Sequence, residues 1–275
     1  MSELKVNAII VAYNPNIDSL NVLINSLKSI ELIILFKNSD FDYVSNANNL
    51  KQIRLDKNVG TAFAYNFCLN YLKADCEFVL ILDQDTLLDS SCLSELIIQS
   101  DKLRTVHDHF IISPVEIDQY GLHRGWGSLS RFNYKKTEVR ASGMFVSRRT
   151  FGILKFDETL FLDYVDWDFC WRASKSHEVL IFKSNKAKIF HQLGSSYLTH
   201  WGLSINTMAP SRIYFQIVNT KKLLFKSHVG LLNRLLLFVR IFKFIFISWI
   251  YKDFLARYYF IFSAIFNSDI SKHLK

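Results

Sequence analysis

Short apolar runs alternate with helical spacings through the first half of the chain. Residues 7–13 form an apolar run that ends at Asn14-Pro15, and residues 77–82 form another that ends at Asp83. Runs that are apolar on both faces are typical of strands buried in a parallel sheet. The alternation continues in strand-like runs at 31–36 and 52–55 and in helical patterns at 18–30 and 61–72. The pattern predicts an α/β fold with a mixed, mostly parallel sheet flanked by helices.

The second half of the chain is less regular up to residue 209. We expect strands at 110–112, 139–147, 179–182 and 187–191, and a helix at 163–175. From residue 210 onward the spacing is helical and the composition is strongly apolar. We therefore divide the chain into an α/β domain at 1–209 and a helical extension at 210–275.

Positive charge is concentrated in that extension. Residues 210–275 contain 11 Lys+Arg and 2 Asp+Glu, whereas the other 209 residues contain 22 and 23. A nearly neutral body disfavours a nucleic-acid binder. A basic, apolar tail favours an anionic membrane surface, although a helical subdomain packed on the body is the plainer alternative. Because charges interrupt every long apolar run, we expect helices that lie in the interface rather than cross it.

The remaining composition suggests a cytoplasmic protein. Apolar side chains follow the first residues directly, without the pattern of a signal peptide. The four cysteines lack the spacing of a zinc site, which predicts reduced thiols. We therefore expect a cytoplasmic body that is peripherally attached to the inner membrane.

Two carboxylates, Asp83 and Asp85, directly follow the apolar run at 77–82. In open α/β sheets, ligands bind at the carboxyl edge of the strands. Two neighbouring like charges there are costly unless they share a cation, and Mg²⁺ or Mn²⁺ prefers hard oxygen ligands. The D-x-D sequence therefore predicts a divalent-metal site that supports a substrate diphosphate. No Walker loop and no G-x-G-x-x-G after a strand is present, which disfavours NTPases and dinucleotide oxidoreductases.

Several further motifs follow one another along the chain. They are Ile9-Ile10-Val11-Ala12-Tyr13-Asn14, Asn58-Val59-Gly60 with Ala64 and Asn66, Asp83-Gln84-Asp85, Ala141-Ser142-Gly143, Phe156-Asp157-Glu158, Asp166-Trp167-Asp168 through Arg172, and His191-Gln192-Leu193-Gly194. In this order they resemble the inverting glycosyltransferases of family 2, which have the GT-A fold. The resemblance covers about residues 5–220.

The resemblance implies a set of binding residues. Contacts with a nucleotide-sugar donor would come from Ala12, Tyr13, Asn14, Asn38, Asn58, Gly60, Asn66, Asp83, Gln84 and Arg172. Metal contacts would come from Asp83, Asp85 and His191, and acceptor contacts from Ser142 and Gly143. Trp126 is a candidate for stacking on the sugar rings of the acceptor. Three plainer roles stay open: a helix salt bridge for Arg172 with Asp168, a hydrogen-bonded core position for His191, and ordinary packing for Trp126.

The resemblance also points to a catalytic base. An acceptor hydroxyl must lose its proton as it attacks the anomeric carbon, and Asp166 matches the family's carboxylate for this step. A single displacement needs one such base, unlike glycoside hydrolysis. The glutamate that precedes the base in the family is Val165 here. We expect Asp163, on the same helical face, to replace it and to raise the pKa of Asp166.

Two segments are similar to rhamnosyltransferases that build bacterial surface polysaccharides. They are Asp163-Tyr164-Val165-Asp166 and Arg212-Ile213-Tyr214-Phe215 with Asn219. This similarity implies that L-rhamnose moves from dTDP-L-rhamnose to a lipid-linked oligosaccharide, in O-antigen or cell-surface polysaccharide synthesis. The nucleobase contact departs from the family, because Lys37 stands where an aspartate is common; Asp40 is the candidate substitute.

Three alternatives remain at this stage. The same fold could use a UDP-sugar. A sugar-1-phosphate nucleotidyltransferase would need a glycine-rich basic loop after the first strand, where this chain has Tyr13-Asn14-Pro15. A non-catalytic peripheral membrane protein would have no use for Asp83, Asp85 or Asp166.

Overall fold

The computed structural model describes residues 5–117, 123–124, 134–135, 138–190 and 195–266. Their contacts divide the chain into two compact units. The first comprises Met1–Thr159 and Val165–Gln192, and the second comprises Leu160–Tyr164 and Leu193–Lys275. The sequence suggested a division at residue 209. The second unit begins earlier because the strands that follow residue 194 pair with each other and not with the sheet of the first unit.

The first unit is built on a mixed sheet. In the described residues, its strand order is β3-β2-β1-β4-β9-β6-β10-β5. The strands are β1 (Val6–Ala12), β2 (Leu32–Lys37), β3 (Leu50–Arg54), β4 (Phe78–Asp83), β5 (Leu87–Leu88), β6 (Phe110–Ile117), β9 (Met144–Ser147) and β10 (Leu180–Phe190), with β7 (His123–Arg124) beside β6 and β8 (Tyr134–Lys135) beside β10. Strands β3, β2, β1 and β4 run parallel, and β9 is antiparallel to both β4 and β6.

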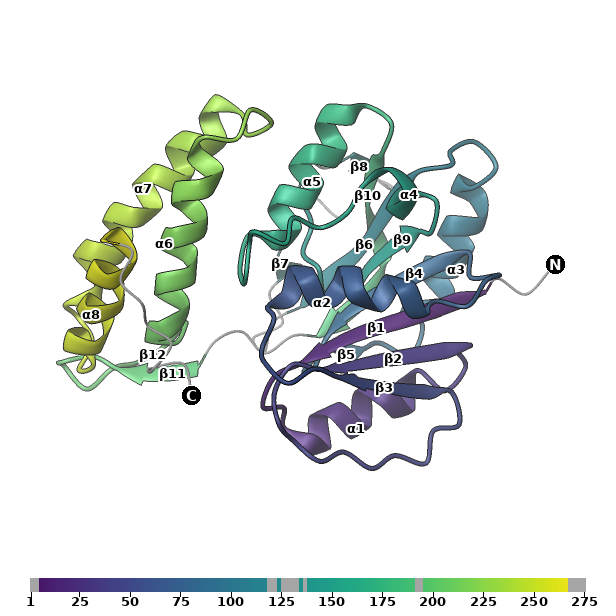
Figure 1. Cartoon of the computed structure of the whole chain (residues 1–275), viewed down its shortest axis with the longest axis horizontal. Helices are drawn as coiled ribbons and strands as arrows, with labels where there is room; N and C mark the ends of the chain where they lie inside the picture. The colour runs from purple at the N-terminus through teal and green to yellow at the C-terminus, as the bar shows by residue number, and fades with distance from the viewer. Residues whose placement is uncertain (1–4, 118–122, 125–133, 136–137, 191–194, 267–275) are drawn as a thin grey trace. The chain divides into compact units, whose positions relative to one another are not determined.

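Helices cover both faces of this sheet (Figure 1). They are α1 (Ile17–Ser26), α2 (Thr61–Cys68), α3 (Cys92–Leu103), α4 (Thr150–Ile153) and α5 (Val165–Ser176), with a 3₁₀ turn η1 (Leu69–Tyr71) after α2. Every residue of β1 is buried, because α1 packs on one face and α2 on the other. The continuous apolar run at the start of the chain is therefore a doubly covered strand, as predicted.

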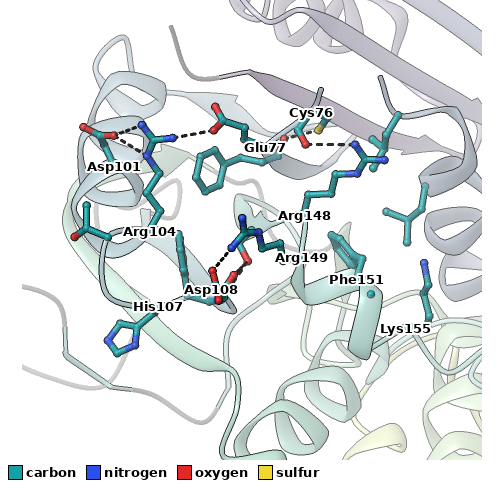
Figure 2. Close-up of a pocket in the computed structure, with 17 residues that line it drawn as sticks. Cys76, Glu77, Asp101, Arg104, His107, Asp108, Arg148, Arg149, Phe151 and Lys155 are labelled. Carbon is teal, nitrogen blue, oxygen red and sulfur yellow. Dashed lines mark hydrogen bonds and ion pairs between the residues drawn. The ribbon is translucent and has the colours of Figure 1, made fainter. Parts of the chain in front are cut away.

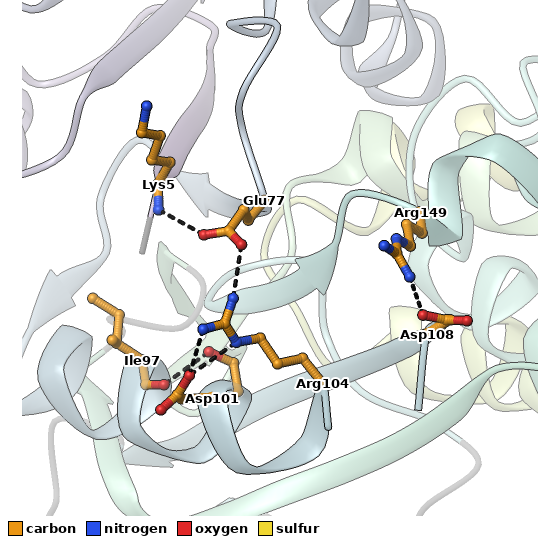
Figure 3. A network of polar contacts seen from close by, with 8 residues as sticks. Lys5, Glu77, Ile97, Asp101, Arg104, Asp108 and Arg149 are labelled. Carbon is orange, nitrogen blue, oxygen red and sulfur yellow. Dashed lines mark hydrogen bonds and ion pairs between the residues drawn. The ribbon is translucent and has the colours of Figure 1, made fainter. Parts of the chain in front are cut away.

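Ion pairs fasten the amino ends of the strands. The Glu77 carboxylate, just before β4, accepts hydrogen bonds from the Lys5 backbone N–H at 3.3 Å and from the Arg104 guanidinium at 2.8 Å (Figure 3). Arg104 also pairs with Asp101 on α3 at 2.8 Å. Partly exposed pairs of this kind add little stability one by one. Together they connect β1, β4 and α3 at the amino ends of the strands, opposite the edge where the strands end.

The second unit contains a hairpin and three helices. The hairpin pairs β11 (Ser195–Leu198) with β12 (Ser204–Thr207), and the helices are α6 (Pro210–Leu224), α7 (Leu231–Ser248) and α8 (Phe254–Ile265). Helices α6 and α8 share an apolar core around Ile217 and Ile261. The guanidinium of Arg257 is buried at the start of α8, where it pairs with Asp253 at 2.8 Å and lies 4.1 Å from the ring centre of Tyr251.

Helix α7 leaves many large apolar side chains exposed. Leu232, Leu236, Val239 and Phe246 lie on one face of the helix, at spacings of three, four or seven residues, together with the cation of Lys243. In the described part of the chain, no helix combines the length and the hydropathy needed to cross a bilayer.

One local feature of the sheet depends on a glycine. Gly143 lies just before β9 with a φ of +82°, and its N–H donates to the Ile81 carbonyl at 2.8 Å. A Cβ atom at this position would lie 2.5 Å from Cγ of Pro114. Side chains are disfavoured both by the left-handed backbone and by the Pro114 ring.

We expect Gly143→Ala to lower the free energy of unfolding by about 2–4 kcal/mol, since it combines a left-handed backbone with an overpacked contact. Chemical denaturation measures the effect. Gly152→Ala is the matched control, because a Cβ there meets nothing within 4 Å and the residue lies in α4. Equal stabilities of the two variants would contradict this account.

Candidate active site

The carboxyl ends of three parallel strands place most of the predicted donor-binding residues at one edge of the sheet. In the register, Val11 of β1 lies opposite Asp83 of β4, and Ala12 lies opposite Lys37 of β2. The side chain of Gln84 links two of these ends, because its Oε1 accepts from the Tyr13 N–H at 2.6 Å and its Nε2 donates to the Tyr13 carbonyl at 3.2 Å. Gln84 thus holds the loop after β1 against the D-x-D segment.

The loops that follow β1 and β2 are tied together in the same way. The Asn38 N–H donates to the Ala12 carbonyl at 2.7 Å, and the Asn38 Oδ1 accepts from the Val59 N–H at 2.9 Å. Asn58 Oδ1 accepts from the Gly60 N–H at 3.0 Å, which shapes the turn into α2. Asn14 has a φ of +45°, and its N–H donates to Ser39 Oγ at 2.8 Å. These asparagines and Gly60 therefore shape the backbone of the edge.

Asp83 is held by groups from two other elements. Its backbone N–H donates to Ser142 Oγ at 3.3 Å, and the Ser142 hydroxyl also shares a hydrogen bond with Thr86. The buried hydroxyl of Tyr65 on α2 donates a hydrogen bond to the Asp83 carboxylate. Burial, followed by the charges of Asp83 and Asp166, raises the pKa of Tyr65 well above its ordinary value. Tyr65 consequently stays protonated and remains a donor.

Tyr65 and Arg140 are the site residues that the motif analysis missed. Tyr65 stands between Ala64 and Asn66, which are both motif residues. Arg140 immediately precedes the Ala141-Ser142-Gly143 segment and pairs with the buried Glu116 at 3.2 Å. The signal that could have revealed Tyr65 is an aromatic residue between two motif residues, on the buried face of α2.

Asp166 lies in the first turn of α5 and is partly accessible. Its Oδ1 accepts from the Trp167 N–H at 2.9 Å, and its Oδ2 accepts from the Ala141 N–H at 3.2 Å. Burial raises the pKa of Asp166 to about 6; the negative charge of Asp83 adds to the rise, while the two N–H groups and Arg140 oppose it. The carboxylate is therefore a stronger base than an ordinary aspartate.

Asp163 precedes α5 and does not belong to the helix that carries Asp166. Helix α5 begins at Val165, so Asp163 is not on a helical face with Asp166, as the sequence had suggested. Its backbone has a φ of +65°, and its carboxylate pairs with Arg212 of α6. The pKa of Asp166 is raised as expected, but the causes are burial and Asp83 rather than Asp163.

Other predicted donor contacts have partners within the protein. The Asn66 side chain bonds the Phe156 backbone in both directions, at 2.9 and 3.0 Å, and Glu158 at 2.9 Å. Asn66 therefore fastens the segment at 156–158 to α2. Asp40, the candidate nucleobase contact, forms an exposed ion pair with Arg54 at 2.6 Å.

Arg172 forms the helix salt bridge that was one of its two predicted roles. Its guanidinium pairs with the fully buried Asp168 at 2.8 Å, one turn earlier on α5. This pair neutralises a charge that would otherwise be costly inside the domain. The two other residues with alternatives, Trp126 and His191, lie outside the described residues.

The donor set at the edge fits a divalent cation that also binds substrate. Among the described residues, no three His, Cys, Asp or Glu side chains form a metal-binding group. Asp83 and Asp85 offer two carboxylates, and Asp85 is exposed. Mg²⁺ typically takes one or two carboxylates from the protein and completes its coordination with water and substrate phosphates. A cation held jointly with a diphosphate is therefore compatible with these residues.

A cavity of about 740 Å³ lies at the opposite edge of the sheet (Figure 2). It is lined by Phe78, the first residue of β4, roughly 17 Å along the strand from Asp83. Its guanidinium groups bond protein atoms: Arg149 pairs with Asp108, and Arg148 donates to backbone carbonyls at 2.6 and 2.9 Å. These cations stabilise the amino edge and are not arranged around the carboxylates of the candidate site.

Comparison with known proteins agrees with this geometry. Residues 8–160 match the family described as Glycosyl transferase family 2. The chain is 28% identical over 248 residues to dTDP-rhamnosyl transferase RfbF of Shigella flexneri, with 82% of each chain covered.

Solved structures with the same fold are more distant in sequence. S. aureus TarS 1-349 in complex with UDP-GlcNAc superposes with a TM-score of 0.56 at 17% identity, over 82% of this chain and 68% of that one. GalNAc-T7 with UDP, GalNAc and Mn²⁺ gives a TM-score of 0.56 at 14% identity, over 70% of this chain and 44% of that one. These likenesses establish the GT-A fold. With more than half of its length matching the family, the chain belongs to glycosyltransferase family 2.

Proposed function

We propose that the protein transfers L-rhamnose from dTDP-L-rhamnose to a hydroxyl of a lipid-linked oligosaccharide, with inversion, in O-antigen or cell-surface polysaccharide synthesis. The observation that carries this proposal is the partly accessible carboxylate of Asp166, whose pKa is raised to about 6. The choice of donor is supported by the similarity to a dTDP-rhamnosyl transferase along most of the chain.

The chemistry follows from the position of Asp166. As the acceptor oxygen forms a bond with the anomeric carbon, its proton moves to the Asp166 carboxylate. The bond from that carbon to the diphosphate oxygen breaks, and its electron pair leaves with the nucleotide. Because this is one displacement from the opposite face, the configuration inverts and one base is sufficient. The N–H groups of Ala141 and Trp167 orient the carboxylate for the step.

Asp83 and Asp85 would hold the Mg²⁺ or Mn²⁺ ion, and His191 is the proposed third contact. When bound, the ion supplies positive charge that stabilises the leaving diphosphate. The protein's own part is to keep Asp83 in place through Ser142 and Tyr65. The loops of Tyr13, Asn38 and Asn58 would receive the nucleotide at the same edge.

We also propose that the second unit attaches the enzyme to the inner face of the cytoplasmic membrane. The exposed apolar face of α7 and the excess of 11 basic over 2 acidic residues in 210–275 support this attachment. Apolar side chains would enter the interface while Lys and Arg reach the anionic head groups. A lipid-linked acceptor would then lie at the same surface.

The acid-base proposal makes a two-part prediction for Asp166. The transfer rate should fall as the pH drops through about 6, because the protonated carboxyl cannot accept a proton. Asp166→Asn should lose transfer by a factor of at least about 100. Its stability relative to the wild type should rise between pH 4 and 7 by up to about 3 kcal/mol, since a raised pKa means that ionisation opposes folding.

Rate measurements and denaturation at several pH values test both parts. Asp101→Asn is the control for the loss of a carboxylate away from the site, because Asp101 lies at the opposite edge of the sheet. A wild-type rate that is flat from pH 4 to 8, or unimpaired transfer by Asp166→Asn, would contradict the role of Asp166 as the base.

Thermal unfolding with dTDP-rhamnose, UDP-sugars and GDP-mannose, each with and without Mn²⁺, tests the donor. Saturation at about 100 times the dissociation constant should stabilise the protein by about 2.7 kcal/mol. We expect metal-dependent stabilisation by dTDP-rhamnose and its loss in Asp85→Asn, which should remain folded. Stronger stabilisation by a UDP-sugar would contradict the assignment of rhamnose as the donor sugar. If no nucleotide sugar stabilises the protein, the non-catalytic alternative is favoured.

Membrane attachment is tested with the full chain and phosphatidylglycerol vesicles, with phosphatidylcholine vesicles for comparison. Wild-type protein should co-sediment with the anionic vesicles, more weakly at high salt. Leu232→Ser/Leu236→Ser/Phe246→Ser should bind at least about tenfold more weakly, because three apolar side chains are lost from the interface. The double variant Val22→Ser/Ile98→Ser, which alters exposed apolar residues of the first unit, should bind normally. Equal losses in both variants would overturn the assignment to α7.

A further inference from the structure

A short segment ahead of the proposed base has an unusual backbone. Asp163 and Tyr164 have φ values of +65° and +60°. Left-handed conformations cost non-glycine residues roughly 1–2 kcal/mol each, and they are rare for a bulky side chain such as tyrosine. Helix α5 begins at the next residue, Val165, and Asp166 follows. The left-handed pair therefore lies immediately before the helix that carries Asp166.

Helix α6 holds this pair through one side chain in particular. Asn219 is 1% exposed, and its Nδ2 donates to the carbonyls of Leu162 at 2.6 Å and of Asp163 at 3.0 Å. Both amide hydrogens are used, and both go to the backbone of the strained segment. Carbonyls in a turn of this kind would otherwise lack partners, which makes the buried amide an effective support.

Further contacts of the second unit hold the same segment. Arg212 pairs with the Asp163 carboxylate, and the ring of Phe215 stacks on Phe161 with centres 4.8 Å apart. The guanidinium of Arg240, on α7, lies 5.6 Å from the ring centre of the buried Tyr164. Residues 160–164 are thus packed by α6 and α7, although they precede α5 of the first unit in the chain.

We propose that Asn219 is a positioning residue for the base Asp166: by holding the left-handed turn at Asp163-Tyr164, it fixes the start of α5. The inference rests on the proposed function for the role of Asp166, and on the hydrogen bonds of Asn219 for the turn itself. Strained backbone persists only where its surroundings over-determine it, and here the surroundings are side chains of α6 and α7. Helix α6 would then affect transfer through the backbone of the residues just before Asp166.

The test compares Asn219→Ala with Ile217→Ala in the full-length protein. Ile217 is a fully buried residue of the same helix that packs toward α8, so its loss weakens the unit but leaves the turn contacts in place. We expect Asn219→Ala to lower kcat for transfer about tenfold or more, with the KM for the donor changed less than about twofold, because small misplacements of a reacting group cost rate rather than binding. Ile217→Ala should keep kcat within about twofold.

Amide hydrogen exchange provides a readout that does not depend on the sugar. Exchange in Asn219→Ala should accelerate in residues 160–170 and stay near wild type in the rest of α6 and α8. Arg212→Gln, which changes an exposed side chain and should fold, is expected to show a smaller effect of the same kind. Exchange that accelerates evenly through the second unit, or equal kcat losses in Asn219→Ala and Ile217→Ala, would overturn the proposal. If wild-type protein transfers no rhamnose, the proposed function fails, and the exchange pattern still decides whether Asn219 holds the turn.

Discussion

The candidate site depends on keeping two carboxylates, Asp83 and Asp166, at one poorly solvated edge of a sheet. Like charges in such a place raise the free energy of the ionised forms. Asp83 receives a hydroxyl hydrogen bond from Tyr65, and its backbone is anchored on Ser142. Burial, together with the charge of Asp83, raises the pKa of Asp166 to about 6. The raised pKa suits the Asp166 carboxylate to accepting a proton.

The edge itself is a consequence of strand direction. Parallel β1, β2 and β4 all end there, so the loops that follow these three strands lie next to one another. Antiparallel β9 begins at the same edge, which returns the chain beside Asp83 and places Ala141 and Ser142 between the two carboxylates. The left-handed Gly143 makes that return possible next to Pro114. The ion pairs of Glu77, Arg104 and Arg149 lie at the opposite edge of the sheet.

The sequence predicts well those features that a local pattern determines. Continuous apolar runs identified β1, β2 and β4, and the D-x-D sequence lies at the carboxyl end of β4 as predicted. Motif matching could not show which polar side chains are used inside the protein. Asn66 and Gln84 match a donor-binding pattern, yet their amides bond to backbone from distant segments. The predicted helix at 163–175 began two residues before the observed one. Asp163 and Tyr164 are left-handed, and a segment that lacks glycine gives no signal of such a backbone.

The position of Asp163 differs from the one that a helical start at this residue would have given. A helical start at Asp163 would have placed its carboxylate beside the base, whereas the observed turn directs it to Arg212. A left-handed pair without glycine is retained only if other contacts offset its cost, and those contacts come from α6 and α7. The same α7 exposes an apolar face that folding alone leaves unburied. Helix α7 therefore contacts the turn through Arg240 and separately exposes an apolar face that includes Leu232, Leu236 and Phe246.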